Sequence, residues 1–265
     1  MILPPDLLPL DDKAIGAWVG SFLWPFFRIA GFFLVAPILS SQTLPQRIRL
    51  GLAVAFTIAL MPALPAMPQM QALTLNTWVL IAQQILIGIS LGTLLQFLFQ
   101  IFVLLGQMVA MQMGLGFASM ADPVNGINVT VLSQFFLISI NLLFLAMNGH
   151  LVMFDTLAES FRILPIGETA PLRESTWLLV QQGTWLFVAS LLMALPAITA
   201  LLIINAAFGV MTRAAPQLNI FSLGFPVSML GGLVAVWVLA HELLPHFDQL
   251  SRQAFGLMRQ WLGVP

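Results

Sequence analysis

The most regular feature of the sequence is a succession of long apolar stretches separated by short polar ones. Six such segments lie at about residues 14–39, 50–67, 78–113, 127–161, 176–211 and 220–244. About 20 helical residues cross the roughly 30 Å hydrocarbon core of a bilayer, so stretches of this length indicate transmembrane helices. The pattern therefore predicts an all-α integral membrane protein with about six long apolar helical segments arranged as helical hairpins.

The third, fourth and fifth segments are too long for single straight spans. The third, from Trp78 to Met113, would extend roughly 54 Å as a straight helix. Such segments either tilt, bend and leave the lipid, or break, and Gly and Pro mark where a helix kinks. We expect long, kinked helices, with these candidate break points: Gly88, Gly92, Gly106, Asn148-Gly149 and Pro196.

The C-terminal stretch has a different pattern. Apolar residues recur there at steps of three and four, and polar residues take the opposite face. The apolar positions are Phe247, Leu250, Ala254, Leu257, Met258 and Trp261. This spacing predicts an amphipathic helix, which we expect to lie on a membrane surface or on another subunit.

Composition narrows the class of protein. Of the 265 residues, 60% are hydrophobic and only 7% are charged, against roughly a quarter in soluble domains. These values exclude a water-soluble globular protein and a disordered one. The net charge of −1 leaves no basic surface for nucleic acid, and the absence of Cys excludes disulfides and Cys-ligated metals.

Glutamines interrupt the third apolar segment. Gln84, Gln96, Gln100 and Gln107 fall near one helical face, and we call them the glutamine stripe. Amides facing lipid would lose hydrogen bonds, at about 0.5–2 kcal/mol each or more. The stripe therefore faces either another helix of the same bundle or, the interpretation we favour, a second subunit or a pore.

An apolar, glycine-containing loop joins the third and fourth segments. Gly114 and Gly116 disfavour a continuous helix and permit left-handed backbone. Such a loop is tolerated only when it is buried in protein or lines a cavity, so it is either a re-entrant packing loop or a pore plug. We predict a plug, because methionines deform to fill gaps. This plug loop comprises Met113, Gly114, Leu115, Gly116, Phe117, Ala118, Ser119, Met120, Ala121 and Asp122.

Few ionisable residues lie within the apolar segments. Arg28 is the most central of them. In a structural role, its guanidinium is paired with helix-end carbonyls or with a carboxylate; in a functional role, it binds a substrate or takes part in proton transfer. We favour the structural role. The spacing of His241 and His246, with Pro245 between them, does not suit two metal ligands on one helix face. We therefore predict a non-enzymatic protein with no catalytic residues, no metal and no cofactor.

The arginines of the short loops suggest an orientation. Arg47 and Arg49 lie in the first short loop, which favours the cytoplasmic side for that loop. The acidic N-terminus and the C-terminus are then expected on the outer side of the membrane.

Several stretches together resemble a known family. They are Arg28 to Phe33 with Pro37, Pro45 to Arg49, Gln112 to Pro123, Asn148-Gly149-His150, Ser160-Phe161, Leu164-Pro165, Thr212 to Phe221, and Gly224-Phe225-Pro226. In order and over nearly the whole chain they resemble the FliR family of flagellar type III export-gate subunits, and more distantly its virulence counterpart, the SctT family. The run from Arg213 to Phe221 is the most specific.

The resemblance implies a function that spacing alone does not show. Members of this family assemble with FliP-like and FliQ-like subunits into a gate for unfolded flagellar substrates, and an FlhB-like subunit joins on the cytoplasmic side. By this likeness, residues 1–175 form a FliP-like part with the plug loop at about 113–123. Residues 176–265 form a FliQ-like hairpin with the C-terminal amphipathic helix. The cytoplasmic tip facing FlhB contains Arg213, Pro216, Gln217 and Asn219.

Two alternatives remain at this stage: a small-molecule secondary transporter, and the homologous subunit of a virulence secretion system. A transporter is expected to show inverted repeats and an ionisable site near the bilayer midplane. It would also run in detergent as a monomer or a symmetric homo-oligomer, whereas a gate subunit requires other chains.

Overall fold

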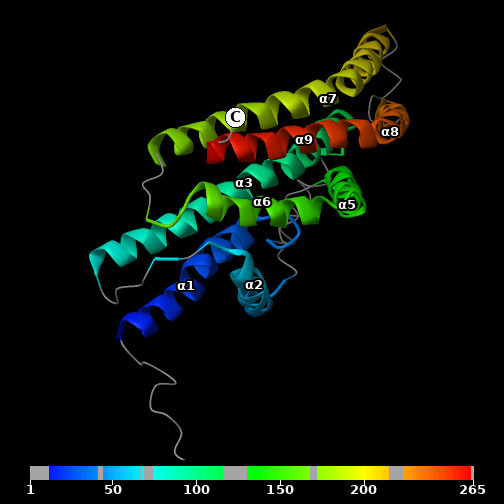
Figure 1. The fold of residues 1–265 in the computed structure, drawn as a ribbon. Helices are drawn as coiled ribbons and strands as arrows, with labels where there is room; N and C mark the ends of the chain where they lie inside the picture. Colours follow the sequence, from blue (N-terminus) through cyan, green and yellow to red (C-terminus); the bar gives the residue numbers. More distant parts are fainter. Residues whose placement is uncertain are drawn as a thin grey trace, which may run out of the picture. The chain divides into compact units, whose positions relative to one another are not determined.

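The described part of the chain consists mainly of helices. The structure is a computed structural model, and it describes residues 12–40, 44–65, 67–68, 74–115, 130–167, 172–214 and 224–263. Over these ranges it contains helices and no strand, which confirms the predicted all-α class (Figure 1). The helices are α1 (Asp12–Val35), α2 (Gln46–Leu60), the 3₁₀ turn η1 (Met61–Ala63), α3 (Leu75–Gln112), α5 (Val131–Ala146), α6 (Gly149–Ile163), α7 (Leu172–Ala214), α8 (Phe225–His241) and α9 (Leu243–Leu262).

Each predicted apolar segment corresponds to one helix or to two consecutive ones. Within the described residues, α3 and α7 are long and apolar enough to cross a membrane, and there are up to four spans if each bent pair of helices counts as one. The second segment differs from expectation, because α2 has only 15 residues and is too short to cross the roughly 30 Å core alone.

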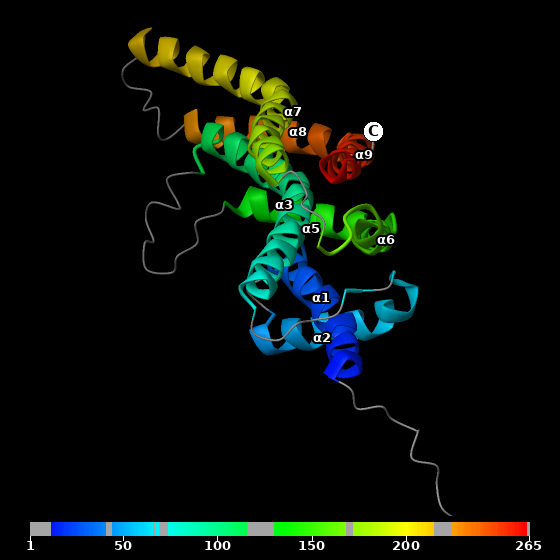
Figure 2. The same cartoon turned by 60° about the vertical axis from the view of Figure 1, so that its left-hand side comes forward.

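Among the break points predicted for the third, fourth and fifth segments, only one interrupts a helix. The fourth segment bends by 71° between α5 and α6, where Asn148 takes a φ of 58°, a left-handed value that Asn tolerates. In contrast, α3 passes through its three glycines as one continuous helix, and α7 also continues through Pro196, although its ribbon bends along its length (Figure 2). The three glycines of α3 therefore did not identify a break.

By contacts, the chain forms two compact units. Unit 1 comprises residues 1–96, 151–179 and 255–265, and unit 2 comprises residues 97–150 and 180–254. The chain passes from one unit to the other within α3, α6, α7 and α9. The predicted division after residue 175 concerns likeness to other proteins, and these units do not test it.

Close packing of α1 against α3 organises unit 1. A Cβ added at Gly88 would meet the backbone of Arg28 and lie 2.7 Å from the Phe32 nitrogen. One added at Gly92 would lie 2.9 Å from the Phe32 oxygen, and one at Gly31 would lie 2.6 Å from the Ile85 oxygen. These glycines let two backbones touch, as small residues spaced four apart do between membrane helices.

A glycine also allows close helix packing in unit 2, between α3 and α5. On the second half of α3, a Cβ at Gly106 would lie 2.6 Å from the Cα of Ser133 in α5. Nearby, the rings of Phe99 and Phe144 meet edge to face at 5.3 Å. The glycines predicted as break points in α3 are thus contact points, and this corrects their interpretation from the sequence.

The amphipathic helix α9 forms as predicted, but its apolar face is covered by the chain itself. Phe247 and Ala254 are buried, and the Phe247 ring lies 6.0 Å from that of Phe102. Trp185 of α7 donates a hydrogen bond to the side chain of Gln253 at 3.1 Å. The expectation that this face lies on a membrane or on another subunit is therefore wrong for the part of α9 in unit 2.

The glycine contacts generate a testable prediction. We expect Gly88→Ala to destabilise the protein by about 1–3 kcal/mol, because the added methyl group meets backbone atoms that can move only with α1. The measurement is thermal unfolding of the detergent-solubilised protein.

Gly183→Ala is the matched control. It lies in α7, where an added Cβ has nothing within 4 Å, and alanine favours a helix over glycine by about 0.8–1 kcal/mol. Equal melting temperatures for the two variants would contradict the close-packing account.

Candidate functional site

Arg28 is the most enclosed charge that the structure describes, and it lies wholly within unit 1. Its Nε and Nη2 atoms donate to Oε1 of Gln84 at 2.8 and 2.6 Å. Nη1 donates to the carbonyl oxygen of Ser160 at 2.7 Å and to its hydroxyl at 3.2 Å, and Nη2 also donates to the Leu164 carbonyl at 2.8 Å. The guanidinium also lies 4.2 Å from the ring centroid of Phe161.

These contacts explain how a buried cation is accommodated. The five N–H donors of arginine match the bonds it makes, and two acceptors are carbonyls at the C-terminal end of α6. That end of a helix carries partial negative charge, and an aromatic face also attracts a cation. The structural role predicted for Arg28 is therefore what the geometry supports.

The members of the glutamine stripe differ in their surroundings. Gln84 is buried and holds Arg28, whereas Gln96, Gln100 and Gln107 are half-buried. Gln96 lies twelve residues beyond Gln84, which places it about 120° away around a regular helix. Gln96, Gln100 and Gln107 are nearly aligned with one another. The structure thus gives Gln84 a partner within the chain, and an intersubunit role for the other three stays a prediction.

The start of the plug loop is a well-defined helix end. Gly114 has a φ of 81°, its amide donates to the Met111 carbonyl at 3.1 Å, and the Leu115 amide donates to the Ala110 carbonyl at 3.0 Å. This is the Schellman arrangement, in which a left-handed residue, usually Gly, ends a helix. It confirms the left-handed backbone expected at Gly114 and sets the direction in which the chain leaves α3.

Side chains from α7 and α8 fix the same helix end. Asn205 of α7 donates from Nδ2 to the Gln112 carbonyl at 3.3 Å, and Ser228 of α8 donates to Oδ1 of Asn205 at 2.5 Å. Met113 is buried and packs directly on Gly232 of α8, where a Cβ would collide with its side chain. The sequence carries no signal for Asn205 or Ser228, since single polar residues within long apolar helices form no motif.

Beyond the plug loop, the described chain resumes at the start of α5, where hydrogen bonds again fix it. Thr130 precedes α5, and its hydroxyl accepts a hydrogen bond from the Ser133 amide at 3.2 Å, which is a typical N-cap. The Ser133 hydroxyl donates to the Val103 carbonyl of α3 at 2.8 Å. The described chain before the loop is therefore attached to α7 and α8, and the described chain after it is attached to α3, all inside unit 2.

Part of the predicted site lies outside the described residues. Of the plug loop, Met113, Gly114 and Leu115 are described, whereas Gly116, Phe117, Ala118, Ser119, Met120, Ala121 and Asp122 are not. Of the predicted tip, Arg213 is exposed in the last turn of α7. Pro216, Gln217 and Asn219 lie outside the described residues.

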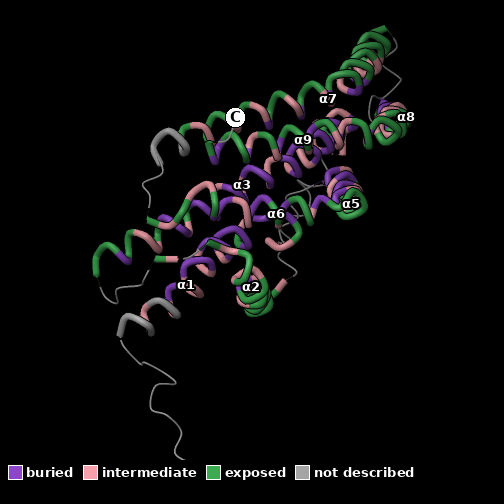
Figure 3. Tube along the Cα trace, viewed as in Figure 1, coloured by how far each residue is buried: buried purple, intermediate pink, exposed green. Residues whose placement is uncertain are grey.

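Large apolar surfaces on α7 and α8 are uncovered within the chain. Figure 3 shows much of both helices in the exposed colour. The exposed side chains include Phe187, Leu191, Leu192 and Ile203 on α7 and Leu230, Val234 and Trp237 on α8. Apolar patches of this extent mark contact with lipid or with other proteins.

Comparison with known proteins gives one consistent result. The family described as "Bacterial export proteins, family 1" matches residues 19–254. The chain is 39% identical to the flagellar biosynthetic protein FliR of Escherichia coli strain K12, over 95% of this chain and 96% of that protein. It is 38% identical to FliR of Pectobacterium carotovorum, covering 91% and 92%, and 28% identical to the surface presentation of antigens protein SpaR of Salmonella typhimurium strain LT2, covering 90% of each.

The fold defines an all-α membrane protein, whose described part contains helices long and apolar enough to cross a bilayer. The match over most of the chain then gives the particular class: the protein belongs to the FliR family of bacterial export proteins. The resemblance inferred from the sequence is thereby confirmed.

The Arg28 contacts generate the second testable prediction. Gln84→Leu removes the acceptor of two guanidinium bonds, and we expect it to lower the free energy of unfolding by about 1–3 kcal/mol. Gln84→Glu keeps an acceptor in reach and should retain most of the stability. Thermal unfolding in detergent measures both effects.

Gln181→Leu provides the control, because Gln181 is exposed on α7. If the melting temperature of Gln84→Leu equals that of the parent and of this control, the hydrogen bonds of Arg28 do not stabilise the fold.

Proposed function

We propose that this chain is a non-enzymatic subunit of the flagellar type III protein-export gate. In this role it forms part of the channel wall at the bacterial inner membrane, and its plug loop seals the resting channel. The observation that carries the proposal is the anchoring of the described chain on either side of the plug loop, at Gly114 and again at Ser133, in a chain whose relatives are named flagellar biosynthetic proteins.

A seal that must open and close needs a fixed base and a deformable tip. Here the base is held by the Gly114 cap, by Asn205 and by the contacts of Ser133. The loop between these points is mostly apolar and contains Met and Phe. An apolar constriction excludes water and ions by dewetting, and such side chains lose no strong hydrogen bonds when an unfolded substrate displaces them.

The proposal includes partner subunits of three kinds. The uncovered apolar surfaces of α7 and α8 and the half-buried Gln96, Gln100 and Gln107 support contact with FliP-like and FliQ-like subunits. The exposed Arg213 at the end of α7 supports a cytoplasmic tip that meets an FlhB-like subunit. In this orientation both termini are periplasmic.

The plug is tested by making its tip polar. We expect Phe117→Asp combined with Met120→Asp to make the resting complex conduct ions, because charged side chains keep a constriction hydrated. The measurement is the conductance of the complex, assembled with its copurifying subunits and reconstituted in a planar bilayer.

Phe117→Leu combined with Met120→Leu is the matched control, because it keeps the loop apolar and should keep the channel closed. Assembly should survive in both variants, since the helices that anchor the loop are unchanged. A charged variant that assembles normally and stays as tight as the parent would show that the loop is packing rather than a plug.

The tip is tested by cross-linking. The chain contains no Cys, so a single Cys at Gln217 gives one reactive position. We expect it to cross-link to an FlhB-like subunit in the assembled complex, because a Pro and Asn following α7 favour a tight turn there. A Cys at the exposed Gln181 should give no such product. Labelling of the Cys at 217 by a reagent confined to the periplasm would reverse the proposed orientation.

A further inference from the structure

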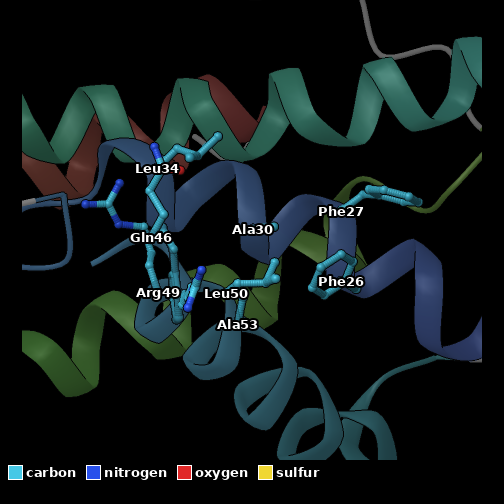
Figure 4. A pocket seen from close by; sticks show the side chains of 10 residues that line it. Phe26, Phe27, Ala30, Leu34, Gln46, Arg49, Leu50 and Ala53 are labelled. Atoms are coloured by element: carbon cyan, nitrogen blue, oxygen red, sulfur yellow. The ribbon is translucent and has the colours of Figure 1, made fainter. Parts of the chain in front are cut away.

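An open groove between α1 and α2 has the chemistry of a lipid site. It has a volume of about 560 Å³. Apolar side chains from both helices form most of it, and three polar residues complete it. In Figure 4 Gln46 and Arg49 lie at one end of this α1–α2 groove, and Phe26 and Phe27 lie at the other.

We propose that the α1–α2 groove binds one anionic phospholipid, with its phosphate at Arg47 and Arg49 and an acyl chain against Phe26, Ala30 and Ala53. The groove separates charge from apolar surface along its length, as an amphiphile does (Figure 4). A soluble anion would use only the arginine end, and an apolar segment of a partner would use only the other.

The charge on the two helices that line the groove favours an anionic occupant. The sequence contains no Asp or Glu between Asp12 and Asp122, so α1, α2 and α3 contribute no carboxylate beyond the first residue of α1. Arg47 is exposed, and the first turn of α2 contains no acidic residue that would oppose a phosphate. Arginine matches phosphate oxygens with two parallel bonds, so the exposed Arg47 can pair with a phosphate, and Arg49 adds a second positive charge to the lining of the groove.

The surroundings of the groove favour a lipid rather than a free phosphate. Leu34 and Leu50 line it and are also exposed, at 53% and 56%. Ile48, Leu52 and Ile58 continue the exposed apolar surface along α2. An apolar helix with two arginines at one end is the arrangement expected at a membrane boundary, where basic residues attract anionic headgroups.

Native mass spectrometry of the full chain in detergent, with any subunits that copurify, tests this site. The probes are phosphatidylglycerol, phosphatidylcholine and soluble glycerol 3-phosphate at equal concentrations. We expect one retained phosphatidylglycerol per chain and weaker retention of the other two. Retention of phosphatidylcholine or of glycerol 3-phosphate equal to that of phosphatidylglycerol, or no retained lipid, would overturn the proposal.

Variants of the chain locate the bound lipid. Arg47→Gln with Arg49→Gln should lower the affinity for phosphatidylglycerol by about tenfold or more. Arg252→Gln with Arg259→Gln changes the net charge equally on α9, where both arginines are exposed, and should leave binding unchanged. Equal effects of the two pairs would mean attraction by net charge alone and would overturn the assignment.

A second variant keeps the test decisive if the arginine variant does not fold. Ala30→Phe fills the groove from α1 without altering charge. It should also prevent retention of the lipid while the protein elutes as the parent does on gel filtration. Unchanged retention in a folded Ala30→Phe protein would show that the lipid lies elsewhere.

Discussion

Unit 1 depends on one buried cation. Arg28 joins α1 to Gln84 of α3 and to the carbonyl end of α6, three elements that are far apart in sequence. Bringing a guanidinium out of water costs several kcal/mol, and only a complete set of acceptors offsets that cost. The relative positions of the three helices are therefore fixed, because a small shift of any one of them leaves a charged donor without an acceptor.

Glycine makes the Arg28 cluster possible. The backbone oxygen of Arg28 lies against Gly88 of α3, so α1 and α3 approach closely. The Arg28 side chain can then reach Gln84, which is also on α3. The positions of these glycines were visible in the sequence, but their effect was misread as breakage. Sequence spacing alone does not distinguish a glycine that bends a helix from one that lets another helix approach, because the difference lies in the neighbour.

Much of the remaining fold followed from local rules. Apolar length predicted the helical segments, the turn at Asn148-Gly149 was found from residue type, and Gly114 was correctly expected to leave the helical region. These features depend on residues close together in sequence. Asn205 and Ser228 were missed because their roles depend on the approach of α3, α7 and α8, which periodicity does not encode. For the same reason the sequence did not reveal that α9 packs against Phe102.

The anchoring of the plug loop separates two demands on one segment. Its path out of α3 is set by backbone bonds to Ala110 and Met111 and by the side chain of Asn205, and its entry to α5 is set by Thr130 and Ser133. In the proposed gate these contacts hold the base of the loop, and the mostly apolar side chains of residues 116–122 form the seal. An apolar loop of this kind, if unanchored, would lower its free energy by collapsing onto the nearest apolar surface. The fixed ends oppose that collapse and are a physical requirement of the proposed gate.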